Sequence, residues 1–366
     1  MNVEEIKKLQ VTYNGKTVGV LAALSEGIAF QYDGEWIKDG FSVSPLSLPL
    51  AEKMYICRKS TFDGLYGVFA DSLPDGWGAL LTARLLAKNG VNYEHLSPLT
   101  KLALVGADGR GALEYFPDIS EHEEFDADLD ELARISADIA DGEQSGDLDK
   151  IFAAGGSSGG TRPKAHIFAD GREWIIKFPC RIDPPDVGMA EYNANMCAKK
   201  CGLNVNGFAL FPSSRCSGYF GAERFDRRGP RRVHMVSLSS LLETSHTVPN
   251  LDYMHLYRTA VALGCPKEDM FEIYARACFN VFYENKDDHG GNFAFIYDEK
   301  YGRYTLAPAY DLTRTPDMAE HEMTLLGNGR PGEEDLRALA CEMGLPRARC
   351  DVIRSKIKAV CASYGA

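Results

Sequence analysis

The first 70 residues alternate apolar and polar positions in short runs, which is the pattern of β-strands with one buried face. Val11–Tyr13 and Thr17–Leu21 flank Asn14–Gly15, a pair typical of tight β-hairpins. A second hairpin turn is predicted at Asp33–Gly34. The chain is therefore expected to begin as an antiparallel meander.

Helical periodicity appears later in the chain. The first predicted helix enters at Leu73–Gly76 and ends at Asn89–Gly90, and segment 117–149, though strongly acidic, keeps one apolar helix face. Further helices are predicted over 189–200, 252–263, 267–283, 333–343 and 347–364, and further strands over 165–169, 173–178, 208–211, 219–225, 293–297 and 304–306. The order is β-rich, then mixed, then helical.

Composition narrows the class of protein. The 366 residues are 45% hydrophobic and 25% charged, as in ordinary globular proteins. The formal net charge of -12 argues against direct nucleic-acid binding, which needs a basic face. With no signal-like or membrane-length apolar stretch, a cytoplasmic location is expected. The ten cysteines contain no C-x-x-C pair; Cys197 and Cys201 share a predicted helix face and are interpreted as buried thiols, with metal ligation as the alternative.

The segment 285–292 carries the candidate chemistry. Asp287 precedes Asn292 by five residues, which is the spacing of the catalytic Asp and the metal-binding Asn in kinases. After a short β excursion, Asp311 has the place of the second metal-binding aspartate, without the following Phe-Gly. Asp288 is the alternative base, and His289 is expected to orient the loop or contact a phosphate.

The same segment has two other interpretations. One is a polar turn between a helix and a strand, since such turns are rich in Asn, Asp and Gly. A simple turn would not explain why an aspartate, Asp311, follows later among apolar residues. A calcium-binding EF-hand loop is excluded, because its twelfth position would be Ile296, which has no carboxylate.

Lys177 ends an apolar strand, where a lysine is costly unless it faces anions, and Glu191 on the next helix is its expected ion partner. The glycine-rich loop 153–164 is interpreted as a phosphate cradle of backbone N–H groups, with charge from Lys164. It also contains G-x-S-x-G, the nucleophile elbow of hydrolases, but a proline and a strand follow where a helix is required. Segment 218–227 resembles a kinase hinge, with adenine bonded to the backbone near Glu223 and Phe225.

These pieces together resemble the HipA-type serine/threonine kinases, the toxins of bacterial toxin–antitoxin pairs. The resemblance rests on the early Tyr-Asn-Gly-Lys hairpin, on the loop ending in Lys164, and on segments 73–76, 176–179, 223–227, 287–292 and 308–312. It spans almost the whole chain.

The resemblance implies a role for each matching residue. Asp287 would be the catalytic base, Asn292 and Asp311 would bind Mg²⁺, and Lys177 would meet the phosphates of ATP. Family members autophosphorylate a serine seven residues before the loop lysine, which here is Ser157; Ser158 adjoins it. A phosphoserine adds about -1.5 to -2 charge, and in this family it expels the loop and stops ATP binding.

The resemblance also implies partners: a helix-turn-helix antitoxin that binds DNA, and a protein substrate, which in studied members is an aminoacyl-tRNA synthetase. Two alternatives remain open, a small-molecule kinase and a catalytically silent kinase-fold binding module.

We therefore expect an α+β, protein-kinase-like two-lobed fold that uses ATP and Mg²⁺. The predicted domains are a β-rich N-terminal subdomain (1–115), a kinase N-lobe (116–228) and a helical C-lobe (229–366). The expected nucleotide-binding residues are Ser158, Gly159, Gly160, Lys164, Lys177, Glu223, Phe225, His289, Asn292, Tyr310 and Asp311.

Overall fold

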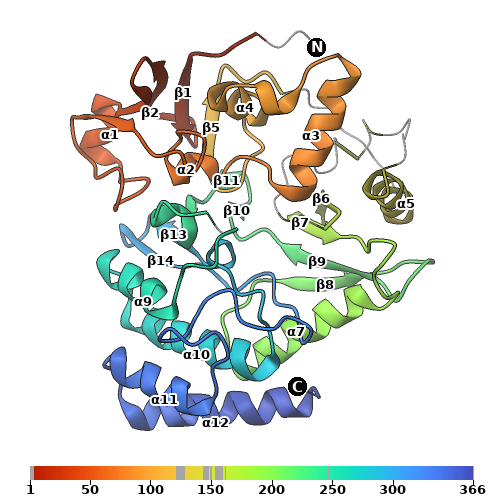
Figure 1. Ribbon diagram of the computed structural model, residues 1–366. Coiled ribbons are helices and arrows are strands. Elements are labelled where there is room, and N and C mark those ends of the chain that lie inside the picture. Colours follow the sequence, from red (N-terminus) through yellow and green to blue (C-terminus); the bar gives the residue numbers. More distant parts are fainter. Residues whose placement is uncertain are drawn as a thin grey trace. The chain divides into compact units, whose positions relative to one another are not determined.

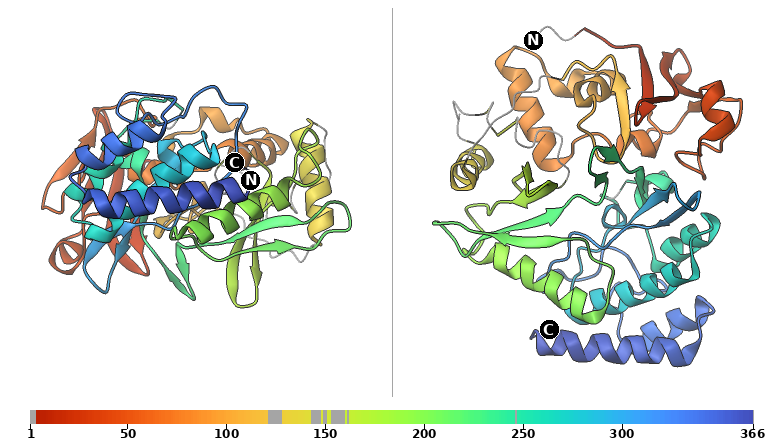
Figure 2. Two further views of the ribbon diagram at one scale, coloured as in Figure 1. Left: turned by 90° about the horizontal axis from the view of Figure 1, so that it is seen from below. Right: turned by 180° about the vertical axis from the view of Figure 1, so that it is seen from behind.

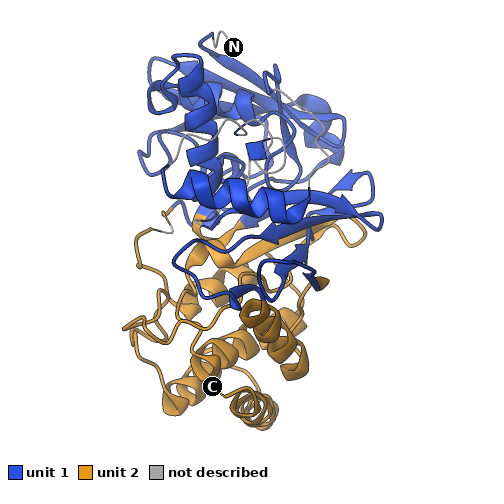
Figure 3. Ribbon diagram, turned by 90° about the vertical axis from the view of Figure 1, so that its right-hand side faces the viewer, with its two compact units in different colours: residues 1–188, 209–236, 240–243 blue, residues 189–208, 237–239, 244–366 orange. Residues whose placement is uncertain are grey.

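The computed structural model describes residues 4–120, 128–142, 148, 151–152, 160, 162–245 and 247–365 (Figure 1). The chain forms two compact units, coloured separately in Figure 3. Unit 1 comprises residues 1–188, 209–236 and 240–243, and unit 2 comprises residues 189–208, 237–239 and 244–366. The predicted division into three domains stays a prediction.

Unit 1 begins with a five-stranded sheet in the order β4-β3-β2-β1-β5. Its strands are β1 (Lys8–Tyr13), β2 (Lys16–Leu24), β3 (Gly27–Tyr32), β4 (Met54–Cys57) and β5 (Leu113–Phe116). All the pairs are antiparallel. The predicted meander and its first hairpin are confirmed, and Asn14 and Gly15 both have the positive φ that this turn requires.

The second predicted hairpin turn, at Asp33–Gly34, is wrong. The Asp33 side chain accepts a hydrogen bond from the backbone N–H of Glu35 and caps the short helix α1 (Gly34–Asp39). Aspartate is favoured both in turns and at helix N-caps, so this pair of residues does not distinguish them. The chain turns instead at residues 25–26, between β2 and β3.

Three helices lie between β4 and β5, and a fourth follows them. These helices are α2 (Gly67–Ala70), α3 (Gly76–Lys88), α4 (Pro98–Val105) and, beyond β5, α5 (Leu129–Ala140), with the 3₁₀ turn η1 (Tyr93–His95) between α3 and α4. Helix α3 is confirmed with the predicted limits. The apolar face predicted in the acidic segment is confirmed in α5, which buries Leu132, Ile135 and Ile139.

A second sheet of unit 1 has the order β6-β7-β9-β8. Its strands are β6 (Lys164–Ala169), β7 (Arg172–Lys177), β8 (Phe208–Phe211) and β9 (Tyr219–Glu223). One face of β6 and β7 buries Ala165, Trp174 and Ile176 in a core shared with α3 and α5. The opposite face carries Lys164, His166 and Lys177, together with Phe168 and Ile175.

Short elements follow β9, namely β10 (Arg227–Arg228), β11 (Arg231–Arg232), β12 (Met235–Ser237) and α8 (Leu238–Leu241). Unit 2 then holds most of α7 (Val187–Cys201) together with α9 (Tyr253–Ala262), α10 (Lys267–Tyr283), α11 (Glu333–Glu342) and α12 (Arg347–Ser363). Each of these five helices was predicted from its periodicity.

Helix α10 is the centre of unit 2 and buries residues on several faces, with α12 running along it and α9 beside it (Figures 1 and 2). A hairpin of β13 (Ala294–Asp298) and β14 (Arg303–Leu306) follows the polar segment after α10. No helix among the described residues is both long and apolar enough to span a membrane.

Candidate active site

The candidate catalytic loop lies between the end of α10 and the start of β13. Helix α10 stops at Glu284, whose left-handed backbone (φ 58) closes the helix and turns the chain into residues 285–289. The loop ends in the 3₁₀ turn η2 (Gly290–Asn292). Two regular elements of unit 2 therefore hold both ends of this polar segment.

Within the loop, Asp287 and Asn292 are joined directly. The side-chain amide nitrogen of Asn292 donates a hydrogen bond to the backbone carbonyl of Asp287 at 2.9 Å. Because the nitrogen makes this bond, the Oδ1 atom of Asn292 faces away from it and can contact other groups. His289 caps η2, its Nδ1 accepting from the N–H of Gly291 at 3.1 Å. The structure therefore assigns His289 a local role in shaping the loop.

Asp288, the alternative base, is enclosed in unit 2. Its carboxylate accepts from the Tyr253 hydroxyl at 2.7 Å, from His321 Nδ1 at 2.9 Å and from the backbone N–H of Met323 at 3.3 Å. The side chain is buried. A carboxylate closed in by three donors cannot reach a substrate hydroxyl, whereas Asp287 is half-buried, so the geometry favours Asp287.

The Asp288 contacts continue as a buried chain of hydrogen bonds. The Tyr253 hydroxyl accepts from Asn280 Nδ2 at 2.8 Å, and the side-chain oxygen of Asn280 accepts from Asn285 Nδ2 at 2.9 Å. Such networks fix one backbone conformation when their members are paired. Sequence reasoning missed Tyr253, Asn280 and His321, which lie in three separate parts of the chain; only their contacts reveal their connection to the loop.

Asp311 has a left-handed backbone (φ 57), which is uncommon outside glycine and is most tolerable for Asp and Asn. The preceding residues are held on both sides. Arg276 Nη2 donates to the Ala307 carbonyl at 2.7 Å, and the Ala309 N–H donates to the Asn204 carbonyl at 2.7 Å. These two bonds fix the chain just before Asp311 within unit 2.

Tyr310 connects this segment to the catalytic loop, because its hydroxyl donates to the Gly291 carbonyl at 2.6 Å. Asn292 and Tyr310 also line one small cavity of about 10 Å³, with the buried Asp288, Asn285 and Arg276. Unit 2 therefore brings together the two stretches of sequence, 285–292 and 308–312, that were predicted to share a site.

In unit 1, Lys164 and Lys177 are direct cross-strand partners on β6 and β7. Directly opposed residues of an antiparallel pair project from the same face, and like charges there are destabilising. Lys177 Nζ lies 5.8 Å from the centre of the Phe220 ring, and Lys164 is buried. The two neighbouring ammonium groups of Lys164 and Lys177 are suited to binding an anion. Lys177 belongs to unit 1 and Glu191 to unit 2, and the expected ion pair between them stays a prediction.

Only part of the glycine-rich loop is described. Ser157, Ser158 and Gly159 lie outside the described residues. Gly160 has φ +85; its N–H donates to the Asp75 carboxylate and its carbonyl accepts from the Trp77 N–H at 2.9 Å. These bonds attach the loop to the entry of α3.

The expected adenine-binding segment begins at the end of β9. Glu223 pairs with Trp174 of β7 and its carboxylate accepts from Arg172, and Phe225 is half-buried. Arg224, between these two residues, and Asp226, just after Phe225, form a buried ion pair.

Several contacts secure that pair within unit 1. The Asp226 carboxylate accepts from the Gly111 N–H at 2.8 Å, and Arg227 Nη1 donates both to this carboxylate and to the Gly111 carbonyl. Burial opposes ionisation of Asp226, but the charges of Arg224 and Arg227 hold its pKa well below the usual range. This cluster, which sequence reasoning missed, attaches residues 223–227 to the N-terminal part of unit 1.

The donor chemistry of these groups fits the expected ligands. An Asp carboxylate and an Asn side-chain oxygen are hard oxygen ligands of the kind that Mg²⁺ takes. Paired lysines and backbone N–H groups suit phosphate oxygens. Unit 2 therefore holds the half-buried Asp287 carboxylate in a loop beside Asn292.

Comparison with known families identifies both parts of the chain. Residues 9–116 match the model of the HipA N-terminal domain, and residues 156–364 match that of the HipA-like C-terminal domain. A search of curated proteins found no significant match.

Solved structures match as well. The HipA of Shewanella oneidensis, solved in complex with HipB and its operator DNA, has a TM-score of 0.72 and 20% sequence identity. That match covers 97% of this chain and 90% of the Shewanella chain. The Helicobacter pylori proinflammatory kinase CtkA has a TM-score of 0.39 and 12% identity, covering 54% of this chain and 88% of that chain.

The Shewanella match and the two compact units confirm the expected α+β, kinase-like two-lobed fold. The C-terminal family model alone spans more than half of the sequence. The chain is therefore a member of the HipA family.

Proposed function

We propose that this chain is an ATP- and Mg²⁺-dependent serine/threonine protein kinase and the toxin of a toxin–antitoxin pair. The observation that carries the proposal is the arrangement of residues 285–292 and 308–312 in unit 2. Asn292 is bonded to the Asp287 backbone, Asp288 is enclosed, and Tyr310 connects the Asp311 segment to the loop.

Each group has a distinct role in this proposal. Asp287 accepts the proton of the attacking serine or threonine hydroxyl and holds that oxygen in line with the γ-phosphate. Asn292 and Asp311 hold Mg²⁺, which when bound neutralises charge on the β- and γ-phosphates. Lys164 and Lys177 balance the remaining phosphate charge from unit 1, and the backbone near Glu223 and Phe225 receives the adenine.

Regulation and partners follow from the family. Ser157, with Ser158 as its neighbour, is the proposed autophosphorylation site, seven residues before Lys164. The Shewanella HipA was solved with HipB and operator DNA, which supports a DNA-binding antitoxin as the partner of this chain. We propose that it works in the cytoplasm on a protein substrate such as an aminoacyl-tRNA synthetase, without direct nucleic-acid contact of its own.

Intact-mass spectrometry after incubation with ATP and Mg²⁺ tests the proposal. The wild type is expected to gain one phosphoryl group, located by fragmentation at Ser157 or Ser158. Asp287→Asn keeps the side-chain shape but removes the base, and should slow the reaction about 10²–10⁴-fold.

The matched control is Asp317→Asn, which makes the same chemical change at an exposed position of unit 2. It should react as the wild type does. A wild type that takes up no phosphate, and phosphorylates no protein in a lysate, would favour the binding module; phosphorylation of small molecules alone would favour the small-molecule kinase.

A further inference from the structure

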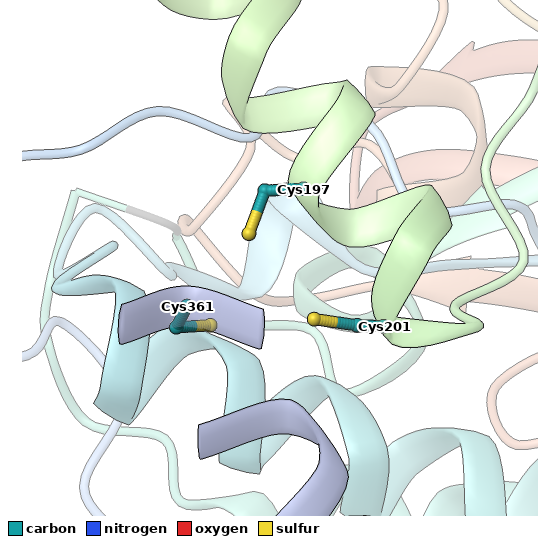
Figure 4. Close-up of side chains that lie close together, drawn as sticks. All are labelled: Cys197, Cys201 and Cys361. Carbon is teal, nitrogen blue, oxygen red and sulfur yellow. The ribbon is translucent and has the colours of Figure 1, made fainter. Parts of the chain in front are cut away.

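Three cysteines of unit 2 gather in its interior. Cys197 and Cys201 lie one turn apart on α7, and Cys361 lies near the end of α12. Their sulfur atoms are all within 4.8 Å of one another, and the three residues are buried. Figure 4 shows the three side chains pointing toward a common space between the two helices.

The other buried cysteines of this chain behave as ordinary apolar side chains. Cys57 donates its S–H to the Leu65 carbonyl at 3.3 Å. Cys278 lies in α10 and Cys350 in α12, and both are buried. Simple packing thus accounts for these thiols, but it does not require three sulfurs to converge on one point.

The number of ligands selects the kind of metal. Among the described residues, no His, Asp or Glu side chain comes as close to the three sulfurs as they are to one another. Structural zinc is almost always four-coordinate, whereas three soft thiolates suit Cu(I). With metal–sulfur bonds of about 2.3 Å, three sulfurs in a plane around one ion lie about 4 Å apart, so small side-chain adjustments complete the site.

We propose that Cys197, Cys201 and Cys361 form a three-coordinate binding site for one Cu(I) ion. Binding is ligand exchange without electron transfer: the thiols lose their protons to solvent as the three Cu–S bonds form. Because the ligands come from α7 and α12, the bound ion would join the C-terminal helix to the rest of unit 2. This site is independent of the proposed kinase activity.

The test is an anaerobic titration of the full-length, reduced protein with Cu(I), kept reduced by ascorbate and buffered by the colorimetric chelator bicinchoninate. The wild type should remove one equivalent of Cu(I) from the chelator. Cys361→Ser and Cys197→Ser should each bind Cu(I) at least a hundredfold more weakly. Cys341→Ser, at an exposed cysteine outside the cluster, is the matched control and should bind as the wild type does.

A second measurement avoids dependence on variants that fail to fold. In the wild type, Cu(I) should slow iodoacetamide alkylation of Cys197, Cys201 and Cys361 together, read by peptide mass, and leave the rate at Cys341 unchanged. Undiminished alkylation of the three, or equal Cu(I) affinity of the wild type and Cys361→Ser, would overturn the proposal. So would a tighter complex with Zn²⁺ than with Cu(I) in the same competition.

Discussion

The buried ion pair between Arg224 and Asp226 offers the sharpest test of the structural reasoning. The Asp226 carboxylate receives Arg224 Nε at 2.9 Å and Nη2 at 2.8 Å, and Arg227 Nη1 at 3.0 Å. Both partners of the pair are almost wholly enclosed, with side-chain exposures of 4% and 7%. Asp226→Ala therefore leaves a buried guanidinium without its main counter-charge.

Removing one partner of a buried pair costs about 3–5 kcal/mol, because the other charge stays desolvated. The same Arg224 also faces Glu173, but at 3.7 Å and with that carboxylate 37% exposed. A solvent-exposed pair is worth only about 0–1 kcal/mol. Glu173→Ala is thus a matched control that removes a carboxylate from the same arginine.

Urea unfolding followed by tryptophan fluorescence measures the effect in the right unit, because Trp36, Trp77 and Trp174, the three tryptophans of the chain, all belong to unit 1. With an m-value of about 3 kcal/mol/M, Asp226→Ala should lower the midpoint by about 1 M or more. A midpoint within about 0.3 M of the wild type, or an equal loss in Glu173→Ala, would refute the burial argument.

The pKa of Asp226 adds a dependence on pH. In the folded state it is held below the value of about 3.9 that aspartate has in an unfolded chain. The stability contributed by ionised Asp226 is therefore complete above about pH 5 and is lost as pH falls through the lower folded-state pKa. The stability difference between the wild type and Asp226→Ala should narrow as the pH is lowered from 5 to 3.

Two further predictions concern unit 2. Tyr253→Phe removes the hydrogen bond to the buried Asp288 carboxylate and also the acceptor of the Asn280 amide, and it should lower stability by at least about 1.5–3 kcal/mol in urea. Tyr257→Phe, which loses only a half-buried bond to a backbone carbonyl, should cost less. Equal losses would contradict a special role for the network around Asp288. Asp311→Asn suits the same left-handed backbone, so it should keep the wild-type melting temperature while slowing phosphate transfer about 10²–10³-fold; a large fall in melting temperature would show that the carboxylate is structural instead.

Local sequence determined most of the secondary structure. The hairpin at Asn14–Gly15 follows from two residues that accept positive φ, and the predicted limits of α10 coincide with those observed. The spacing of Asp287 and Asn292 was readable because a loop of fixed length connects them. At Asp33 local information failed, since the same residue types begin helices and make turns.

Tertiary structure alone decided which side chains meet. Two adjacent carboxylates, Asp287 and Asp288, are distinguished as candidate bases by their burial and by the number of hydrogen-bond donors around each. The donors to Asp288 include Tyr253 and His321, each more than 30 residues away in sequence. The cysteine cluster likewise needed Cys361 to be brought by α12 to α7, across 160 residues from Cys201. Periodicity reports which face of an element is buried, whereas the partner that covers that face is set by packing between elements distant in the chain.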